Sequence, residues 1–320
     1  LEFRRVLFRS SSVFKNLTVY RLGPLDALTL DQVETGLATA RFAPCAPTQA
    51  QSAGWVEPRG VAHAPLVESI AGQWLMAYRV ERRMVPASVV KRRVEEFAAK
   101  IEHDTGRKPG RRETKELKEQ ALHELLPMAF TKLAEVRVWL DPVNALLLIG
   151  TAGATQSGDV VTALVKALPG LVVGDLQTTM SPAAAMTDWL ATGEPPAVFS
   201  VDRECELKSP DEMKSVVRYT RHALDTDEVR QHLALGKVPT QLSMTWGGRV
   251  SFMLTDTLRL KKLAFLDGVF EGRPEKADEA FDTDAAIATG EIGRLLPDLI
   301  DALGGEPAAA GAPAGETALA

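Results

Sequence analysis

The chain has 320 residues and a formal net charge of −5, with 45% hydrophobic and 25% charged residues. A chain of this length is longer than a single small hydrophobic core requires, so we expect an ordinary folded protein with two or three subdomains. The acidic balance excludes a uniformly basic nucleic-acid binder, so any such role requires segregated charge. Two distant cysteines, Cys45 and Cys205, exclude a disulfide scaffold and a four-cysteine zinc site, and they fit a reducing compartment. The sequence contains no run of 18 apolar residues, so it predicts no membrane-spanning helix.

Both ends of the chain are predicted to lie outside the fold. Residues 1–12, LEFRRVLFRSSS, have neither a long apolar core nor a small-residue cleavage site, and we interpret them as a non-native segment. Residues 307–320 are rich in Ala, Pro and Gly, which predicts a disordered tail.

Between these ends, strand and helix periodicities alternate in the first half of the chain. Period-two alternation predicts strands, and apolar residues at helical spacing predict helices. Pro109-Gly110 separates two predicted helices and so indicates a helical hairpin. The predicted strands are Phe14–Leu22 and Gln73–Pro86, and the predicted helices are Leu30–Phe42, Pro86–His103 and Arg112–Leu126.

Antiparallel hairpins dominate the second half. Asp-Pro-Val-Asn interrupts the apolar segment Glu135–Thr151, and Gly247-Gly248 interrupts Gln241–Leu254, which predicts two hairpins; residues 257–267 continue the second as another strand. No regular βαβ repeat is present, so the fold class is α+β with mixed, mainly antiparallel sheets. Short helices are predicted at Asp159–Leu168, Pro182–Thr192, Asp225–Leu235 and Thr289–Leu303.

No catalytic or metal-binding motif stands out. The sequence lacks GxxxxGK[ST], HExxH and GxSxG, and no GxGxxG follows a strand. The five histidines lack metal-ligand spacing, so we predict neither a metal nor a cofactor. Cys45 follows Pro44 in an apolar context, which favours burial over reactivity. We therefore predict that the protein is not an enzyme, with a nuclease built from distant carboxylates as an alternative.

Charge is segregated along the chain. Between Arg79 and Lys118, thirteen Lys and Arg residues stand against seven acids, a local balance of +6. From Asp267 onward, twelve acids stand against three cations, a balance of −9. A surface of one sign attracts a polyanion even when the whole protein is acidic.

The basic segment has two interpretations. Pairs at i,i+4 such as Arg92–Glu96 are typical of a solvated helical hairpin with no ligand. The runs Lys91–Arg93 and Arg107–Arg112 instead place like charges together, which costs stability unless an anion neutralises them. We favour binding to a phosphate backbone, without base readout, because no aromatic interleaving accompanies the charge. The candidate DNA contacts are Lys91, Arg92, Arg93, Lys100, Arg107, Lys108, Arg111, Arg112, Lys115 and Lys118.

Motifs spread over the chain resemble the family of the recombination-associated protein RdgC. No single motif is catalytic, but their order and spacing together are specific, and the similarity extends from about Val13 to Glu306. The motifs are FKNLTVYRL (14–22), F-x-P-C (42–45), GWVEPRG (54–60), LLPMAF (125–130), WLDPVNALLL (139–148), HLALGKVPTQLSMTW (232–246) and LIDALGGE (299–306).

This resemblance implies a ring-shaped homodimer in the bacterial cytoplasm, associated with the nucleoid. Such a ring encircles double-stranded DNA without sequence preference and restrains recombination promoted by RecA, which is a possible partner. It also implies a domain plan: a central α+β region (13–78 and 135–200), a helical tip (79–134) and a base region (201–306).

Further site residues follow from the same resemblance. Phe130 matches a position near the closing interface, or gate, with core burial as the alternative. Arg218, Arg221 and His222 match DNA-facing or gate positions, with a solvated strand face as the alternative for the two arginines. The rival functions are a metal-dependent nuclease and an interaction protein that docks its basic hairpin on the recombinase itself.

Overall fold

The computed structural model describes residues 14–25, 28–270 and 277–307, with side chains from residue 281 in the last range. The segment 1–12 and all but one residue of the predicted tail lie outside these ranges. Twelve strands of the described chain form one sheet, in the order β2-β4-β5-β6-β1-β12-β11-β10-β8-β9, with β3 beside β4 and β7 beside β1. Every named strand pair is antiparallel, which confirms the α+β class. None of the described helices is long and apolar enough to cross a membrane.

The elements follow one another along the chain from β1 to α7. The strands are β1 (Leu17–Leu22), β2 (Gln51–Val56), β3 (Val67–Ile70), β4 (Gln73–Met84), β5 (Phe130–Asp141), β6 (Leu146–Ile149), β7 (Val173–Asp175), β8 (Phe199–Lys208), β9 (Val216–Thr220), β10 (Val238–Trp246), β11 (Val250–Thr255) and β12 (Arg259–Phe265). The helices are α1 (Leu30–Ala38), α2 (Ala87–Thr105), α3 (Arg111–Leu125), α4 (Ala154–Ala167), α5 (Pro182–Thr192), α6 (Asp227–Ala234) and α7 (Ala277–Ala302), with the short 3-10 turn η2 (Leu126–Met128) after α3.

Strand alternation divides the apolar residues between two cores, one on each face of the sheet. On one face, Met76 and Val138 pack with Val33 of α1 and Leu164 of α4. On the other, Trp139, Leu242, Met244 and Trp246 pack with α5 and α7. Because successive side chains of a strand point to opposite faces, both faces of the central strands are covered.

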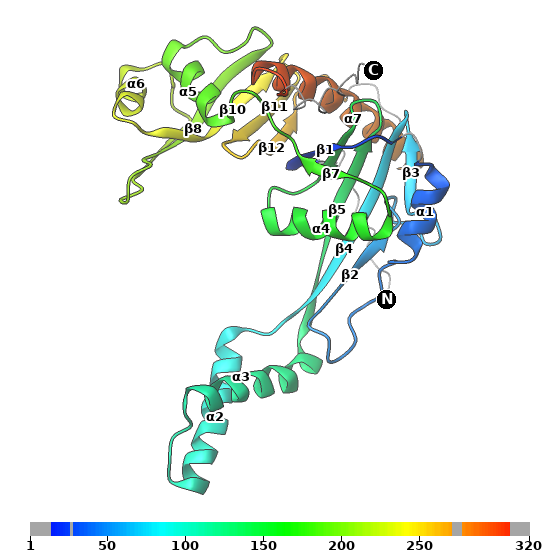
Figure 1. The fold of residues 1–320 in the computed structure, drawn as a ribbon, viewed down its shortest axis with the longest axis vertical. Coiled ribbons are helices and arrows are strands. Elements are labelled where there is room, and N and C mark those ends of the chain that lie inside the picture. The colour runs from blue at the N-terminus through cyan, green and yellow to red at the C-terminus, as the bar shows by residue number, and fades with distance from the viewer. Residues whose placement is uncertain (1–13, 26–27, 271–276, 308–320) are drawn as a thin grey trace, which may run out of the picture.

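The molecule curves into an arc in Figure 1. The α5 and α6 helices lie at one end, and α2 and α3 lie at the other, beyond the main sheet. The long strands β4 and β5 reach this second end as a paired ribbon whose last register pair is Met84 with Phe130. All six residues Phe130–Glu135 at the start of β5 are exposed, so this part of the ribbon extends beyond the core.

Several element boundaries differ from those predicted. Helix α1 ends at Ala38 rather than Phe42, α4 begins at Ala154 rather than Asp159, and α7 begins at Ala277 rather than Thr289. Strands β2, β3, β7 and β8 were not predicted. Both hairpins and the third strand after Gln241–Leu254 are confirmed as β5–β6 and β10–β11–β12. The division into tip, centre and base stays a prediction.

Candidate nucleic-acid interface

The α2 and α3 helices are amphipathic and pack on one another at the end of the β4–β5 ribbon. Val90 of α2 and Leu117 and Ala121 of α3 are buried, whereas most other positions of both helices are exposed. Gly106 ends α2 with φ +72°, a left-handed conformation that glycine adopts without a Cβ clash. The sequence therefore folds this segment through a narrow apolar seam and leaves its charged residues at the surface.

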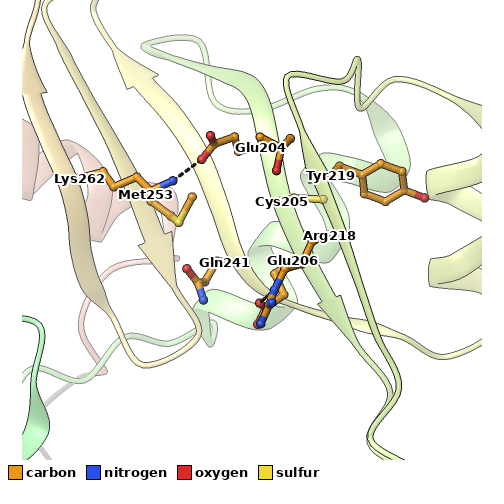
Figure 2. Close-up of a pocket in the computed structure, with 9 residues that line it drawn as sticks. Glu204, Cys205, Glu206, Arg218, Tyr219, Gln241, Met253 and Lys262 are labelled. Atoms are coloured by element: carbon orange, nitrogen blue, oxygen red, sulfur yellow. Dashed lines mark hydrogen bonds and ion pairs between the residues drawn. The ribbon is translucent and has the colours of Figure 1, made fainter.

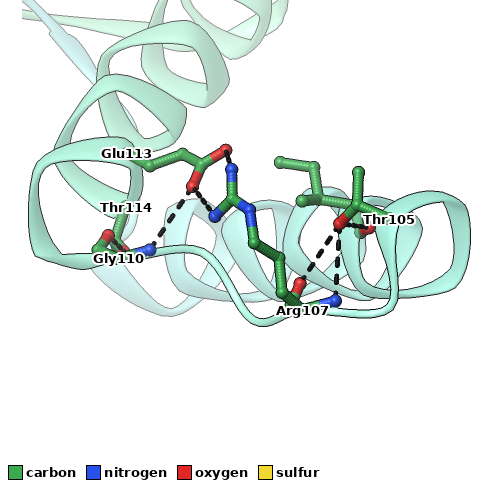
Figure 3. A network of polar contacts seen from close by, with 6 residues as sticks. Thr105, Arg107, Gly110, Glu113 and Thr114 are labelled. Atoms are coloured by element: carbon green, nitrogen blue, oxygen red, sulfur yellow. Dashed lines mark hydrogen bonds and ion pairs between the residues drawn. The ribbon is translucent and has the colours of Figure 1, made fainter.

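A carboxylate fastens the turn between the two helices (Figure 3). The Arg107 guanidinium donates from Nη1 to Glu113 Oε2 at 2.8 Å and from Nη2 to Oε1 at 3.3 Å. The backbone N–H of Gly110 also donates to Glu113 Oε2, at 3.4 Å. Hydrogen bonding by Arg107 holds the pKa of Glu113 below its usual range. Arg107 therefore serves the turn, although the sequence assigned it to DNA.

Five of the ten basic residues predicted on this segment have a carboxylate partner. Lys91 lies 3.8 Å from Glu95, and Arg92 lies 3.9 Å from Glu96, at the i,i+4 spacing of a solvated helix. Arg112 Nε lies 3.3 Å from Glu116 Oε1. Acids within the segment therefore lie within ion-pair distance of Lys91, Arg92, Arg93, Arg107 and Arg112, so these runs do not need an external anion to offset part of their charge, and their contact with DNA stays a prediction.

Arg93 has the most contacts of these five residues. Its guanidinium donates to Glu96 on α2 at 2.7 Å and to both oxygens of Glu124 on α3, at 2.9 and 2.7 Å. Its Cζ also lies 4.6 Å from the centre of the Phe97 ring. The paired hydrogen bonds hold the pKa of Glu124 below its usual range. Arg93 thus joins the two helices and is poorly placed to leave Glu124 for a phosphate.

The other five cations are exposed and, within the described ranges, have no carboxylate within ion-pair distance: Lys100, Lys108, Arg111, Lys115 and Lys118. Three of them, Arg111, Lys115 and Lys118, follow one another on α3 at spacings of four and three. Residues three and four apart lie on the same face of a helix. We call Arg111, Lys115 and Lys118 the α3 cation stripe. In this stripe the segment concentrates cations that have no carboxylate within ion-pair distance in the described chain.

Phe130 begins β5 beside the α2–α3 end and is 89% exposed, so the alternative of core burial is wrong. Met84, Met128 and Leu133 are exposed as well. Met84 pairs with Phe130 in the β4–β5 ladder. Met128 ends the 3-10 turn η2, two residues before Phe130. Met84, Met128 and Phe130, which we call the ribbon apolar cluster, are exposed apolar residues at the end of the ribbon, whereas Leu133 points to the other face of β5.

Strand β9, which carries Arg218 and directly precedes Arg221 and His222, pairs with β8. Figure 1 shows β8 at the opposite end of the arc from α2 and α3. Arg218 lies on β9 and donates to Glu206 Oε2 at 2.5 Å. Arg221 and His222 follow β9, and Arg221 has φ +55°. The centres of the His222 and Tyr219 rings lie 5.4 Å apart. One protomer therefore does not bring all the predicted contacts together.

Beyond the basic residues, the described part of the chain holds no group of three or more His, Cys, Asp or Glu residues that could bind a metal ion. Burial raises the pKa of the Cys205 thiol to about 12, and burial also raises that of Cys45. Both thiols are therefore protonated at neutral pH and are weak nucleophiles.

The sequence is similar to known proteins over 92% of its length. A family model described as "Putative exonuclease, RdgC" matches residues 13–306. A "Recombination-associated protein RdgC" from Herminiimonas arsenicoxydans is 42% identical over 298 residues, covering 92% of this chain and 99% of that protein. Proteins with the same name from Dechloromonas aromatica and Cupriavidus necator are 43% and 45% identical, each covering 92% of this chain and 98% of its own length.

Proposed function

Because the chain belongs to the RdgC family, we propose that it binds double-stranded DNA without sequence preference and restrains RecA-promoted recombination in the bacterial nucleoid. The observation that carries the proposal is the α3 cation stripe. Three exposed cations on one helix face, without carboxylate partners in the described chain, leave a charge excess that suits a phosphate backbone.

Counterion release supplies the affinity in this proposal. Duplex DNA carries a condensed layer of cations, and each phosphate neutralised by Lys or Arg releases some of them. Binding then weakens steeply as salt is added. Each phosphate contact contributes about −0.9 to the slope of log K against log salt concentration. Because phosphates are the same at every base pair, such contacts carry no sequence information.

Encirclement by a homodimer is the second part of the proposal. The protomer is an arc with an exposed apolar cluster near one end (Figure 1). A second copy that covered Phe130 and its neighbours would remove apolar surface from water and close that end around a duplex. DNA held inside a closed ring leaves only at an end or when an interface opens. DNA coated in this way is less available to a recombinase that pairs homologous strands.

A gel shift on two duplexes of unrelated sequence, across a salt series, tests the DNA-binding proposal. We expect equal affinities and equal, steep salt slopes for the two duplexes. Arg111→Glu should weaken both equally and lower both slopes by about 0.9. Arg92→Glu should have a smaller effect, because Glu96 already offsets the Arg92 charge. Unequal losses on the two sequences would contradict backbone binding.

Two other functions are distinguished by separate experiments. The family description favours a nuclease as the second candidate. Incubation of labelled duplex with Mg²⁺ or Mn²⁺ should leave the strands intact, and cleavage would replace our proposal with that one. Recombinase inhibition that does not depend on the ratio of protein to DNA would instead favour direct docking on the recombinase.

A further inference from the structure

The second end of the arc carries an open sheet face with its own cations. On β8, Cys205 and Leu207 point into the core beneath α5 and α7, so Glu204 and Glu206 point to the opposite face. On β10, Ser243 and Thr245 lie between buried residues in the same way. In Figure 1, α7 runs along the outer side of the arc over β10–β12, so the open face is turned toward the concave side.

Lys262 and Glu204 meet across this face (Figure 2). Lys262 Nζ lies 2.6 Å from Glu204 Oε2, and the Lys262 side chain is 65% exposed. In the sheet order, β12 and β8 are separated by β11 and β10. In a flat sheet their Cα atoms would lie roughly 14 Å apart, close to the limit set by the roughly 11 Å that the two side chains span together and the 2.6 Å between Nζ and Oε2. The ion pair therefore needs both side chains to extend toward each other over β10 and β11.

The backbone directs Lys262 onto this face. The β11–β12 ladder has an irregularity between Ser251 and Met253, and Lys262 has φ +50° at that point of β12. Its N–H is held by Asn16 Oδ1 at 3.3 Å. A β-bulge re-aims a side chain, and a residue other than glycine with positive φ costs free energy that functional positions often retain.

The hollow between the strands is lined by both cations and acids. It has a volume of about 290 Å³ and is lined by Glu204, Glu206, Arg218, Gln241, Lys262 and neighbouring residues. Glu206 accepts from Arg218 at 2.5 Å and from the Thr240 hydroxyl at 2.7 Å. Among the described side chains, only Lys262 donates a hydrogen bond to the Glu204 carboxylate. The Lys262–Glu204 pair is therefore the less firmly held of the two.

We propose that Lys262 is a DNA-backbone contact that Glu204 holds, and competes for, in the free protein. This inference rests on the proposed DNA-binding function. An exposed ion pair contributes only about 0.2–1 kcal/mol, so a phosphate can take the place of Glu204 at little cost. Once DNA is bound, the Glu204 carboxylate repels the nearby phosphate. Glu204 thus lowers the affinity that Lys262 would otherwise add and keeps this contact exchangeable.

The two partners of this pair should change DNA affinity in opposite directions. Glu204→Gln should tighten binding about two- to fivefold, the fold-change equivalent of an exposed ion pair. Lys262→Gln should weaken binding by a similar factor and lower the salt slope by about 0.9. The gain from Glu204→Gln should shrink when Lys262→Gln is also present, because the two residues interact.

Matched controls lie on α7, on the covered side of the sheet. Arg294→Gln and Asp301→Asn make the same charge changes at exposed sites there and should leave affinity unchanged. If wild type and the α3 variants behave as proposed but Glu204→Gln gives no gain or a loss, this inference fails alone. If wild type does not bind duplex DNA, the proposed function fails. A thermal melt of each variant confirms that the fold is intact.

Discussion

The two ends of the arc both carry exposed cations, but they hold them differently. On α3, Arg111, Lys115 and Lys118 have no carboxylate partner in the described chain. On the open face of β8–β12, Arg218 and Lys262 each contact a carboxylate of β8. The difference teaches that a cation's availability depends on its neighbours in space. In our proposal the α3 end captures DNA, and the β8–β12 end adds a weaker, exchangeable contact.

The largest effect should come from the α3 cation stripe. Reversing all three charges, as Arg111→Glu, Lys115→Glu and Lys118→Glu, removes three phosphate contacts. At about 0.1 M salt we expect affinity to fall at least a hundredfold, with a salt slope lower by about 2.7 for each protomer that contacts the DNA. Titration of a fluorescent duplex measures both. A triple variant that binds like wild type would place DNA elsewhere on the molecule.

The ribbon apolar cluster should govern assembly. Phe130→Asp places a charge where an apolar contact is proposed. The dissociation constant of the dimer should therefore rise about ten- to a hundredfold, which is the equivalent of losing the burial of one Phe side chain. Sedimentation at several concentrations measures this change. Val143→Asp is a control at another exposed apolar residue, away from the cluster. Equal dimer affinity in wild type and Phe130→Asp would remove this cluster from the interface.

Arg93 and Arg111 separate stability from binding within one segment. Arg93→Ala breaks the contacts with Glu124 and Glu96, so amide hydrogen exchange in α2 and α3 should quicken. Arg111→Ala should leave that exchange unchanged and weaken DNA binding severalfold. Exchange mass spectrometry and duplex titration compare the two. Faster exchange in Arg111→Ala would show that the α3 cation stripe also has a structural role.

The smallest effect should be a loosening of the α2–α3 segment in acid. Arg93 and Arg107 lower the folded-state pKa values of Glu124 and Glu113. A lowered carboxylate pKa stabilises the fold above the unfolded-state pKa, about 4.3, and this contribution is lost as the pH falls. Exchange in α2 and α3, corrected for intrinsic rates, should therefore increase below about pH 5. Arg93→Ala should show less of this pH dependence.

Local patterns in the sequence predicted the class of fold and its long elements. Alternation identified β10, where Leu242, Met244 and Trp246 are buried and the intervening residues are not. It did not identify β8, because that strand carries Asp202, Glu204 and Glu206 on an open face and lacks a clear apolar run. Helix α7 begins earlier than predicted because its first residues are mostly polar or small.

The candidate site was predictable as a segment but not as a set of free charges. Counting cations located α2 and α3, and helical spacing could have singled out Arg111, Lys115 and Lys118. Arg93 differs because its partner Glu124 lies on the other helix, 31 residues away in the chain. Lys262 could not have been found, because its position depends on a ladder irregularity and its partner lies 58 residues away.

Retention on circular DNA tests the central claim most directly. The protein is loaded on a nicked circular duplex and on the same duplex linearised, and both are then washed at a salt concentration that dissociates ordinary electrostatic complexes. A closed dimer that encircles DNA should stay on the circle and leave the linear molecule through its ends. Equal loss from both forms, with a dimer confirmed by mass, would contradict encirclement.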